Sequence, residues 1–258
     1  MPLPCARRAT RGNGNIILNG KFVSVTDRGR GDPILLLHGF LSKKESFYYQ
    51  TTALESAGYR VIAPDMPCFG ASESVDRAWS VGDYAEWLRL FMEKKDLYGA
   101  HVLAHSFGAR VIFKLLAGDN RLAGKVIITG GAGLVKPRSP RYMRQVKRYR
   151  RIKKLFPRYA EKHFGSEEYR TLPPLMRESY KLIVNEDLKE CAAKIKNQVL
   201  LIYGRQDTVT PLSEEGETFN RLIAGSRLEV IEGGHFCFSE NHAEFNRLML
   251  NFLGGKEV

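Results

Sequence analysis

The chain has 258 residues, of which 43% are hydrophobic, and its formal net charge at pH 7 is +12. Such a chain is long and apolar enough to bury the core of one α/β domain with an insertion, which excludes a largely disordered protein. No apolar run approaches the roughly 20 residues that cross a bilayer, so we expect a soluble protein.

The N-terminal segment, residues 1–14, is basic and carries no apolar stretch of the kind found in secretory signals. We expect a flexible tail there and a cytoplasmic protein. The cysteines form no C-x-x-C pair and no cluster with histidine, which predicts reduced thiols and no metal site. They are Cys5, Cys68, Cys191 and Cys237.

The first predicted element is a β-hairpin over residues 14–27, because two runs of β-formers flank Asn19-Gly20, a pair that tolerates the positive φ of a tight turn. Short apolar runs follow, each ahead of a segment with the pattern of an amphipathic helix. These runs are 33–37, 60–63, 100–104, 125–129, 198–203 and 227–231. The alternation predicts an α/β fold with a mostly parallel central sheet, flanked by helices and begun by an antiparallel edge.

One long stretch interrupts this alternation. Residues 136–197 contain no strand-like run and instead have the pattern of helices separated by Pro157, Pro173 and Pro174. We interpret the stretch as a helical cap, inserted into a core made of residues 1–135 and 198–258.

A candidate nucleophile follows the predicted strand 100–104. Ser106 stands between this strand and a predicted helix, with Ala104 two residues before it and Gly108 two residues after. Small residues at these two positions are what a sharp strand-to-helix turn needs in order to hold a serine hydroxyl above a sheet. The alternative, a serine that only caps a helix, fits the local sequence equally well.

Candidates for the acid and the base follow two later strands. Asp207 comes after 198–203, and His235 comes after 227–231 behind two glycines. Either residue alone could be structural. The chain order of nucleophile, acid and base favours a catalytic triad, in which His235 is the general base and Asp207 orients it.

With these motifs, the chain resembles the α/β-hydrolase fold superfamily, and within it the lid-bearing serine hydrolases of esterase type, over nearly its whole length. Residues 38–40 and 63–70 support the resemblance. It implies an oxyanion hole formed by the backbone N–H groups of Phe40 and Phe107, and it implies no metal and no cofactor. Two positions depart from the family pattern, since Ala104 and Cys68 stand where glycine is usual.

Serine at the elbow favours acyl chemistry, because relatives that open epoxides or remove halides use aspartate there. The leading hypothesis is hydrolysis of a carboxylic ester, thioester or lactone through an acyl-enzyme intermediate. Two alternatives stay open: hydrolysis of a carbon-carbon bond by the same triad, and a non-catalytic protein that uses the pocket to bind a ligand. For His38 and His105 we expect supporting roles.

A strongly basic segment lies within the predicted cap. Residues 136–162 contain twelve Lys or Arg and a single acid, Glu161, and apolar residues recur among them at helical spacing. We favour a solvated lid face whose apolar stripe packs over the pocket, which makes Tyr149, Phe156 and Phe236 candidate pocket residues. A membrane or an acidic partner is the alternative, and nucleic acid is disfavoured because no recognition fold accompanies the charge.

Overall fold

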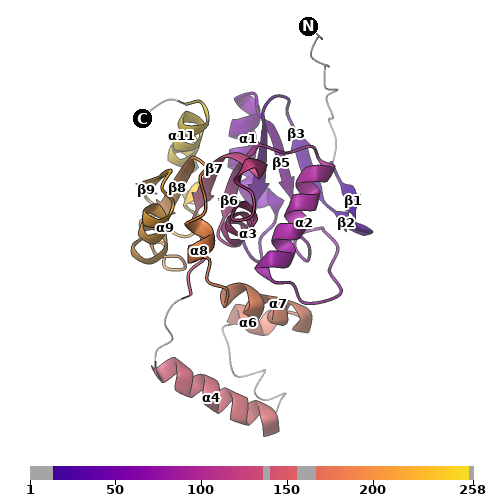
Figure 1. Cartoon of the computed structure of the whole chain (residues 1–258), viewed down its shortest axis with the longest axis vertical. Helices are drawn as coiled ribbons and strands as arrows, with labels where there is room; N and C mark the ends of the chain where they lie inside the picture. Colours follow the sequence, from indigo (N-terminus) through magenta and orange to yellow (C-terminus); the bar gives the residue numbers. More distant parts are fainter. Residues whose placement is uncertain (1–13, 136–139, 156–166, 256–258) are drawn as a thin grey trace.

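The computed structural model describes residues 14–135, 140–155 and 167–255 (Figure 1). Its main sheet has seven strands in the order β3-β5-β4-β6-β7-β8-β9, in which β3 is antiparallel to β5 and the other neighbours are parallel. The strands are β3 (Val25–Arg28), β4 (Pro33–Leu37), β5 (Arg60–Pro64), β6 (Ala100–His105), β7 (Ala123–Thr129), β8 (Val199–Gly204) and β9 (Ser226–Ile231). The predicted parallel strands are confirmed.

The predicted hairpin is confirmed, but it does not belong to the main sheet. Strands β1 (Ile16–Leu18) and β2 (Lys21–Val23) pair with each other, and the turn has φ of 51° at Asn19 and 77° at Gly20. The extended strand is interrupted at Ser24, between β2 and β3. The Ser24 N–H donates to the Ser72 hydroxyl at 2.9 Å, and the Ser24 carbonyl accepts from the N–H of Asp65 at 2.8 Å. Because these bonds replace a strand ladder, the antiparallel edge of the main sheet is β3 alone.

Alternate residues of the parallel strands enter two different hydrophobic cores, as the two-residue period of a strand requires. On one face, Leu35 and Val102 pack with α2 (Val81–Lys94) and α3 (Phe107–Leu116). On the other face the strands meet a second set of helices, and both cores are almost fully buried. These helices are α1 (Tyr48–Ser56), α10 (Cys237–Glu240) and α11 (His242–Leu253).

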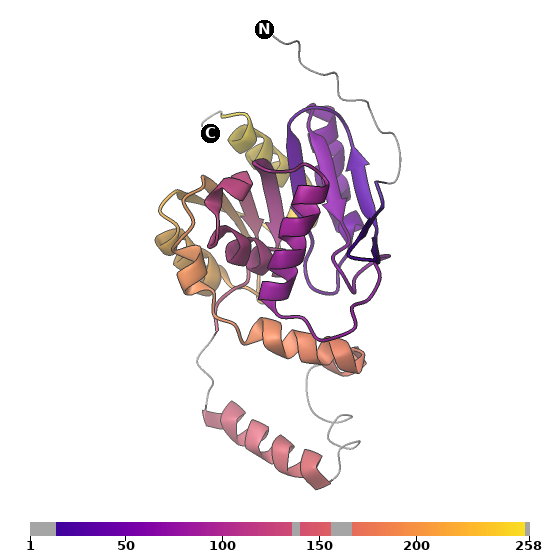
Figure 2. The same ribbon diagram turned by 45° about the vertical axis from the view of Figure 1, so that its right-hand side comes forward.

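Between β7 and β8, the described residues form helices and no strand. The helices are α4 (Pro140–Leu155), α6 (Glu167–Thr171), α7 (Pro174–Val184) and α8 (Lys189–Ala192). Helix α7 is tied to the rest of the protein by Arg110 of α3, which donates to the carbonyl of Ile183 at 3.0 Å. Figures 1 and 2 both show α4 beyond α6 and α7, on the side away from the sheet. No helix in the described ranges is long and apolar enough to span a bilayer.

A buried carboxylate fixes the antiparallel edge of the sheet. Asp27 of β3 accepts two hydrogen bonds from Arg60 of β5, both at 2.9 Å, and pairs with Lys95 after α2 at 2.7 Å. Burial acts to raise the pKa of Asp27, but the hydrogen bonds from Arg60 and Lys95 outweigh it and lower the pKa below its ordinary value of 3.8. The edge strand is therefore held by charge as well as by its ladder.

We expect Asp27→Asn to lower the free energy of unfolding by about 2 kcal/mol at pH 7, because two partly buried cations lose their counter-charge. Since the pKa of Asp27 is lowered on folding, this stabilisation is present above about pH 4 and is lost as the pH falls through the folded pKa. Denaturant unfolding at pH 7 and pH 3 measures both effects. The matched control is Asp76→Asn, at an 85% exposed side chain, which should change stability by less than about 0.5 kcal/mol. Equal losses in both variants would contradict this assignment.

Candidate active site

Ser106 occupies a strained turn between β6 and α3. Its backbone has φ of 49° and ψ of −106°, a conformation that costs a non-glycine residue about 1–3 kcal/mol. Three backbone hydrogen bonds hold it there: the Ser106 N–H donates to the carbonyl of Thr129 at 3.2 Å, and the Ser106 carbonyl accepts from the N–H groups of Ala109 and Ala132 at 3.1 and 3.4 Å. This is the geometry of a nucleophile elbow, which lifts a hydroxyl above the sheet.

Small residues allow this turn to sit close to its neighbours. A Cβ atom on Gly108 would lie 2.3 Å from the backbone oxygen of Leu37, so a larger residue would push α3 away from β4. Ala104 is fully buried in β6, in register with Leu37 on one side and Ile128 on the other. The elbow therefore forms with alanine at the position where glycine is usual.

Asp207 and His235 form a short hydrogen bond. The His235 Nδ1 atom lies 2.9 Å from Asp207 Oδ2, and the buried carboxylate also accepts from the N–H groups of Val209 and Thr210 at 2.8 and 2.9 Å. Burial acts to raise the pKa of Asp207, but the hydrogen bonds from His235 and Thr210 outweigh it and lower the pKa. The ionised carboxylate holds the proton of His235 on Nδ1 and leaves Nε2 able to accept one.

The end of β7 brings Ser106 and His235 into the same small region. Thr129 binds the N–H of Ser106, and a Cβ on the next residue, Gly130, would lie 3.1 Å from His235 Nδ1. Within the described residues, the Ser106 hydroxyl makes no hydrogen bond. The structure therefore places the predicted nucleophile, acid and base at the carboxyl ends of β6, β8 and β9, where open α/β sheets bind their ligands.

His105 supports the candidate base, His235. Its ring is buried, its Nε2 donates to the carbonyl of His235 at 3.0 Å, and the centroids of the two rings are 4.7 Å apart. Burial lowers the pKa of His105 to about 3, so the ring is neutral. Thr210 is a second support, since its hydroxyl donates to Asp207 Oδ2 at 2.8 Å. The sequence offered only weak signals for it, namely a hydroxyl three residues after a loop aspartate.

The two predicted oxyanion donors, Phe40 and Phe107, come from the loop after β4 and from the start of α3, and their rings contact each other. Phe107 is the first residue of α3, so its N–H is free of the helix ladder, and its ring lies 5.8 Å from the ring of Phe40. The Phe40 loop is fixed by His38, which donates to the Gly39 carbonyl at 2.8 Å and accepts from the N–H of Met66 at 2.9 Å. Burial lowers the pKa of His38 to about 4, which keeps it neutral and keeps both bonds.

Aromatic rings surround this corner. Phe40 contacts Phe69 with 5.2 Å between ring centroids and Tyr180 of α7 with 5.3 Å. Neither Phe69 nor Tyr180 was predicted, because only the folded chain brings α7 against the loop after β4. The result is an apolar wall of rings around Phe40, formed by Phe69, Phe107 and Tyr180.

The predicted pocket residues lie in different places. Phe236 is 46% exposed, and its ring lies 5.1 Å from that of His105, next to the base. Tyr149 is half-buried on α4, a helix that lies beyond α6 and α7 in Figures 1 and 2. Phe156 lies outside the described residues.

Cys68 occupies a position that favours glycine for a conformational reason. Its φ is 72°, in the left-handed region that glycine adopts most easily. The thiol is half-buried and accepts from the N–H of Val75 at 3.4 Å, and burial raises its pKa. A protonated thiol bound in this way has no features of a nucleophile.

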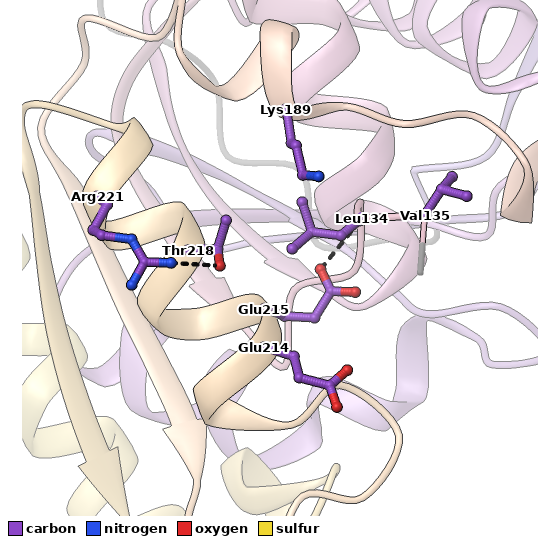
Figure 3. A pocket seen from close by; sticks show the side chains of 7 residues that line it. All are labelled: Leu134, Val135, Lys189, Glu214, Glu215, Thr218 and Arg221. Carbon is purple, nitrogen blue, oxygen red and sulfur yellow. Dashed lines mark hydrogen bonds between the residues drawn. The ribbon is translucent and has the colours of Figure 1, made fainter. Parts of the chain in front are cut away.

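A separate cavity of about 540 Å³ opens on another part of the surface (Figure 3). Glu215 faces the backbone of Leu134 in it and accepts its N–H at 3.2 Å. The cavity contains none of the predicted catalytic residues, so we do not assign it to catalysis. Its lining residues are Leu134, Val135, Lys189, Glu214, Glu215, Thr218 and Arg221.

The chain belongs to the alpha/beta hydrolase family, whose model matches residues 34–248. It is 28% identical to a 2-hydroxy-6-oxononadienedioate/2-hydroxy-6-oxononatrienedioate hydrolase of Escherichia coli, over 97% of this chain and 98% of the relative. Among solved structures it is similar to an esterase from Exiguobacterium antarcticum, with a TM-score of 0.77 and 24% identity over 94% of this chain and all of the other. A bromoperoxidase from Bacillus anthracis has a TM-score of 0.78 and 21% identity over the same shares. These two structures support the fold.

We expect Ser106→Gly to be more stable than Ser106→Ala by about 1 kcal/mol, although both remove the hydroxyl. Glycine relieves the strain at φ of 49°, which outweighs its larger entropy loss on folding, whereas alanine keeps the strain. Denaturant unfolding of the two variants measures the difference. The same pair of substitutions at Ser239, which lies in α10, should show the opposite order. Backbone strain at Ser106 is excluded if alanine is the more stable residue at both positions.

We expect Asp207→Asn to lower kcat by about 10⁴-fold with little change in KM, because the imidazole loses the partner that fixes its tautomer and stabilises its charge. Steady-state hydrolysis of a p-nitrophenyl ester measures this effect. Asp119→Asn, in an exposed loop before β7, is the control and should retain full activity. A loss of less than tenfold in the Asp207 variant would remove Asp207 from the triad.

Proposed function

We propose that this member of the hydrolase family cleaves a carboxylic ester, or a related acyl compound such as a thioester or lactone, through an acyl-enzyme intermediate on Ser106. The proposal rests on one observation above all: the 2.9 Å bond between His235 and Asp207 stands beside a serine held in the backbone conformation of a nucleophile elbow. This arrangement supplies a nucleophile, a base and an orienting carboxylate.

In the proposed reaction, His235 Nε2 takes the hydroxyl proton as Ser106 Oγ attacks the carbonyl carbon. The backbone amides of Phe40 and Phe107 stabilise the oxyanion, and each such donor contributes about 3–4 kcal/mol to catalysis. The protonated His235 then gives its proton to the departing alcohol, while Asp207 stabilises the imidazolium. Water, activated by the same histidine, hydrolyses the acyl-enzyme in the second half.

The aromatic wall supports an apolar acyl group as the preferred substrate. Phe40, Phe69 and Tyr180 lie on the side of the site where the carbonyl oxygen would bind, and they offer ring surface in place of charge. A short or medium acyl chain, or an aryl group, would bury apolar area against these rings.

Hydrolysis of a carbon-carbon bond is the second candidate, supported by the 28% identity to the Escherichia coli hydrolase. The same serine, histidine and aspartate would serve this reaction, with a carbanion in place of an alkoxide as the leaving group. A ligand-binding protein without catalysis is the third, and it has the least support because the residues for acyl transfer stand together.

We expect hydrolysis of a p-nitrophenyl ester series of increasing acyl length to show a maximum at a short or medium chain. Ser106→Ala should abolish this activity, with a loss of at least about 10³-fold, because the nucleophile is removed. The readout is release of p-nitrophenol, with far-UV circular dichroism to establish that the variant is folded.

A fluorophosphonate probe separates the remaining outcomes. If folded protein is inactive on every ester but is labelled at Ser106, the carbon-carbon hydrolase is favoured, and product analysis with a vinylogous diketone tests it. Folded protein that neither turns over an ester nor reacts with the probe would contradict the proposed function and favour a binding role.

A further inference from the structure

Helix α4 has a charge composition unlike that of the other helices in the described ranges. Eight of its 16 residues are Lys or Arg and none is acidic. On α2, by comparison, Arg89 pairs with Glu86 and Glu93 on the same helix at 2.8 and 3.2 Å. Because like charges three and four residues apart repel one another, α4 needs counter-charge from outside the helix to offset the repulsion.

The described side chains of α4 divide into two faces. Cations are exposed on one side, whereas Val146 and Ile152 are half-buried on the other. The exposed cations are Arg144, Lys147, Arg148, Arg151 and Lys154. At 100° per residue these cations fall within one half of the helix circumference, and Val146 and Ile152 fall outside it. Of the other three cations, Arg141 extends this face, whereas Arg150 and Lys153 fall on the side of Val146, so the helix is basic over most of its circumference and its apolar side is narrow.

The position of α4 leaves it accessible to a large partner. In both views it lies on the outside of the molecule, beyond α6 and α7, and the sheet is on the far side of those helices (Figures 1 and 2). Of the described side chains of α4, neither Val146 nor Ile152 belongs to either core of the main sheet.

We propose that α4 docks the protein on the surface of an anionic lipid bilayer. The cations would contact lipid phosphates, and Val146 and Ile152 would enter the boundary between headgroups and acyl chains. An interfacial helix combines these two features, a basic face and an apolar stripe beside it. A nucleic acid would neutralise the cations but offers no apolar phase for Val146 and Ile152 to enter. A lipid surface offers both anionic phosphates and an apolar interior, so we favour lipid. This inference goes beyond the proposed hydrolase activity and does not depend on it.

The test is co-sedimentation of the full chain with vesicles of phosphatidylcholine alone and with vesicles that also contain an equal share of phosphatidylserine. We expect binding to the anionic vesicles only, weakened by salt. The double variant Lys147→Glu with Arg151→Glu should bind at least about tenfold more weakly, since each basic residue near an anionic surface contributes about 1 kcal/mol. Val146→Ser with Ile152→Ser should also bind severalfold more weakly, although it leaves the net charge unchanged.

The matched control is Arg28→Glu with Arg30→Glu, at two exposed cations on β3 and after it, which changes the net charge by the same amount. It should bind within about twofold of the unmodified chain, because only α4 meets the lipid. Circular dichroism establishes that each variant is folded.

The proposal is overturned if the unmodified chain does not bind anionic vesicles, or if the control loses as much affinity as the α4 charge variant. It is also overturned if the serine variant binds undiminished, or if an RNA oligonucleotide displaces the protein from vesicles.

Discussion

The backbone at Ser106 is the constraint on which the candidate active site depends. A serine with φ of 49° is stable only where surrounding contacts over-determine it, and here the chain leaves β6 and enters α3 within one residue. The turn must approach β4 so closely that only glycine fits at position 108, and it must lie within bonding distance of Thr129 at the end of β7. The packing of β4, β6 and β7 therefore holds the Ser106 hydroxyl in place. The strained backbone of Ser106 is part of the geometry that presents this hydroxyl above the sheet.

Around this turn, buried polar groups tie together loops that follow different strands. His38 connects the loop after β4 to the loop after β5, and His105 connects the end of β6 to the residue that carries the base. Asp65 accepts from Lys44 and from the N–H of Ala71, which fixes the loop that carries Phe69. Each of these groups makes at least one hydrogen bond to a residue more than 20 positions away, so the loops hold their shape only in the assembled sheet.

The sequence predicted the sheet well because a buried parallel strand has a local signature, a short run such as residues 33–37 in which every side chain is apolar. The triad candidates were found because their chain order is itself a signal. Phe69 and Tyr180 had no such signal, since their roles arise from contacts such as that between Tyr180 and Phe40, 140 residues apart. Thr210 has only a weak one, a hydroxyl three residues after Asp207. The interruption of the strand at Ser24, which separates the hairpin from β3, depends on hydrogen bonds to residues 65 and 72 that no local pattern encodes. For α4, periodicity predicted an amphipathic helix but not which surface lies against its apolar side.

The two buried imidazoles also set how the protein responds to acid. In the folded protein the pKa of His38 is about 4 and that of His105 is about 3, whereas an exposed histidine has a pKa near 6.5. Between these values the unfolded chain binds more protons than the folded one, so the free energy of unfolding decreases as the pH falls from about 6.5 towards 4. Both rings connect loops at the carboxyl ends of the strands, and protonation would break the bond that His38 accepts from Met66. Within the fold both rings stay neutral until the pH approaches 4, so the loops that they connect keep their hydrogen bonds in mild acid while the free energy that separates the folded from the unfolded chain decreases.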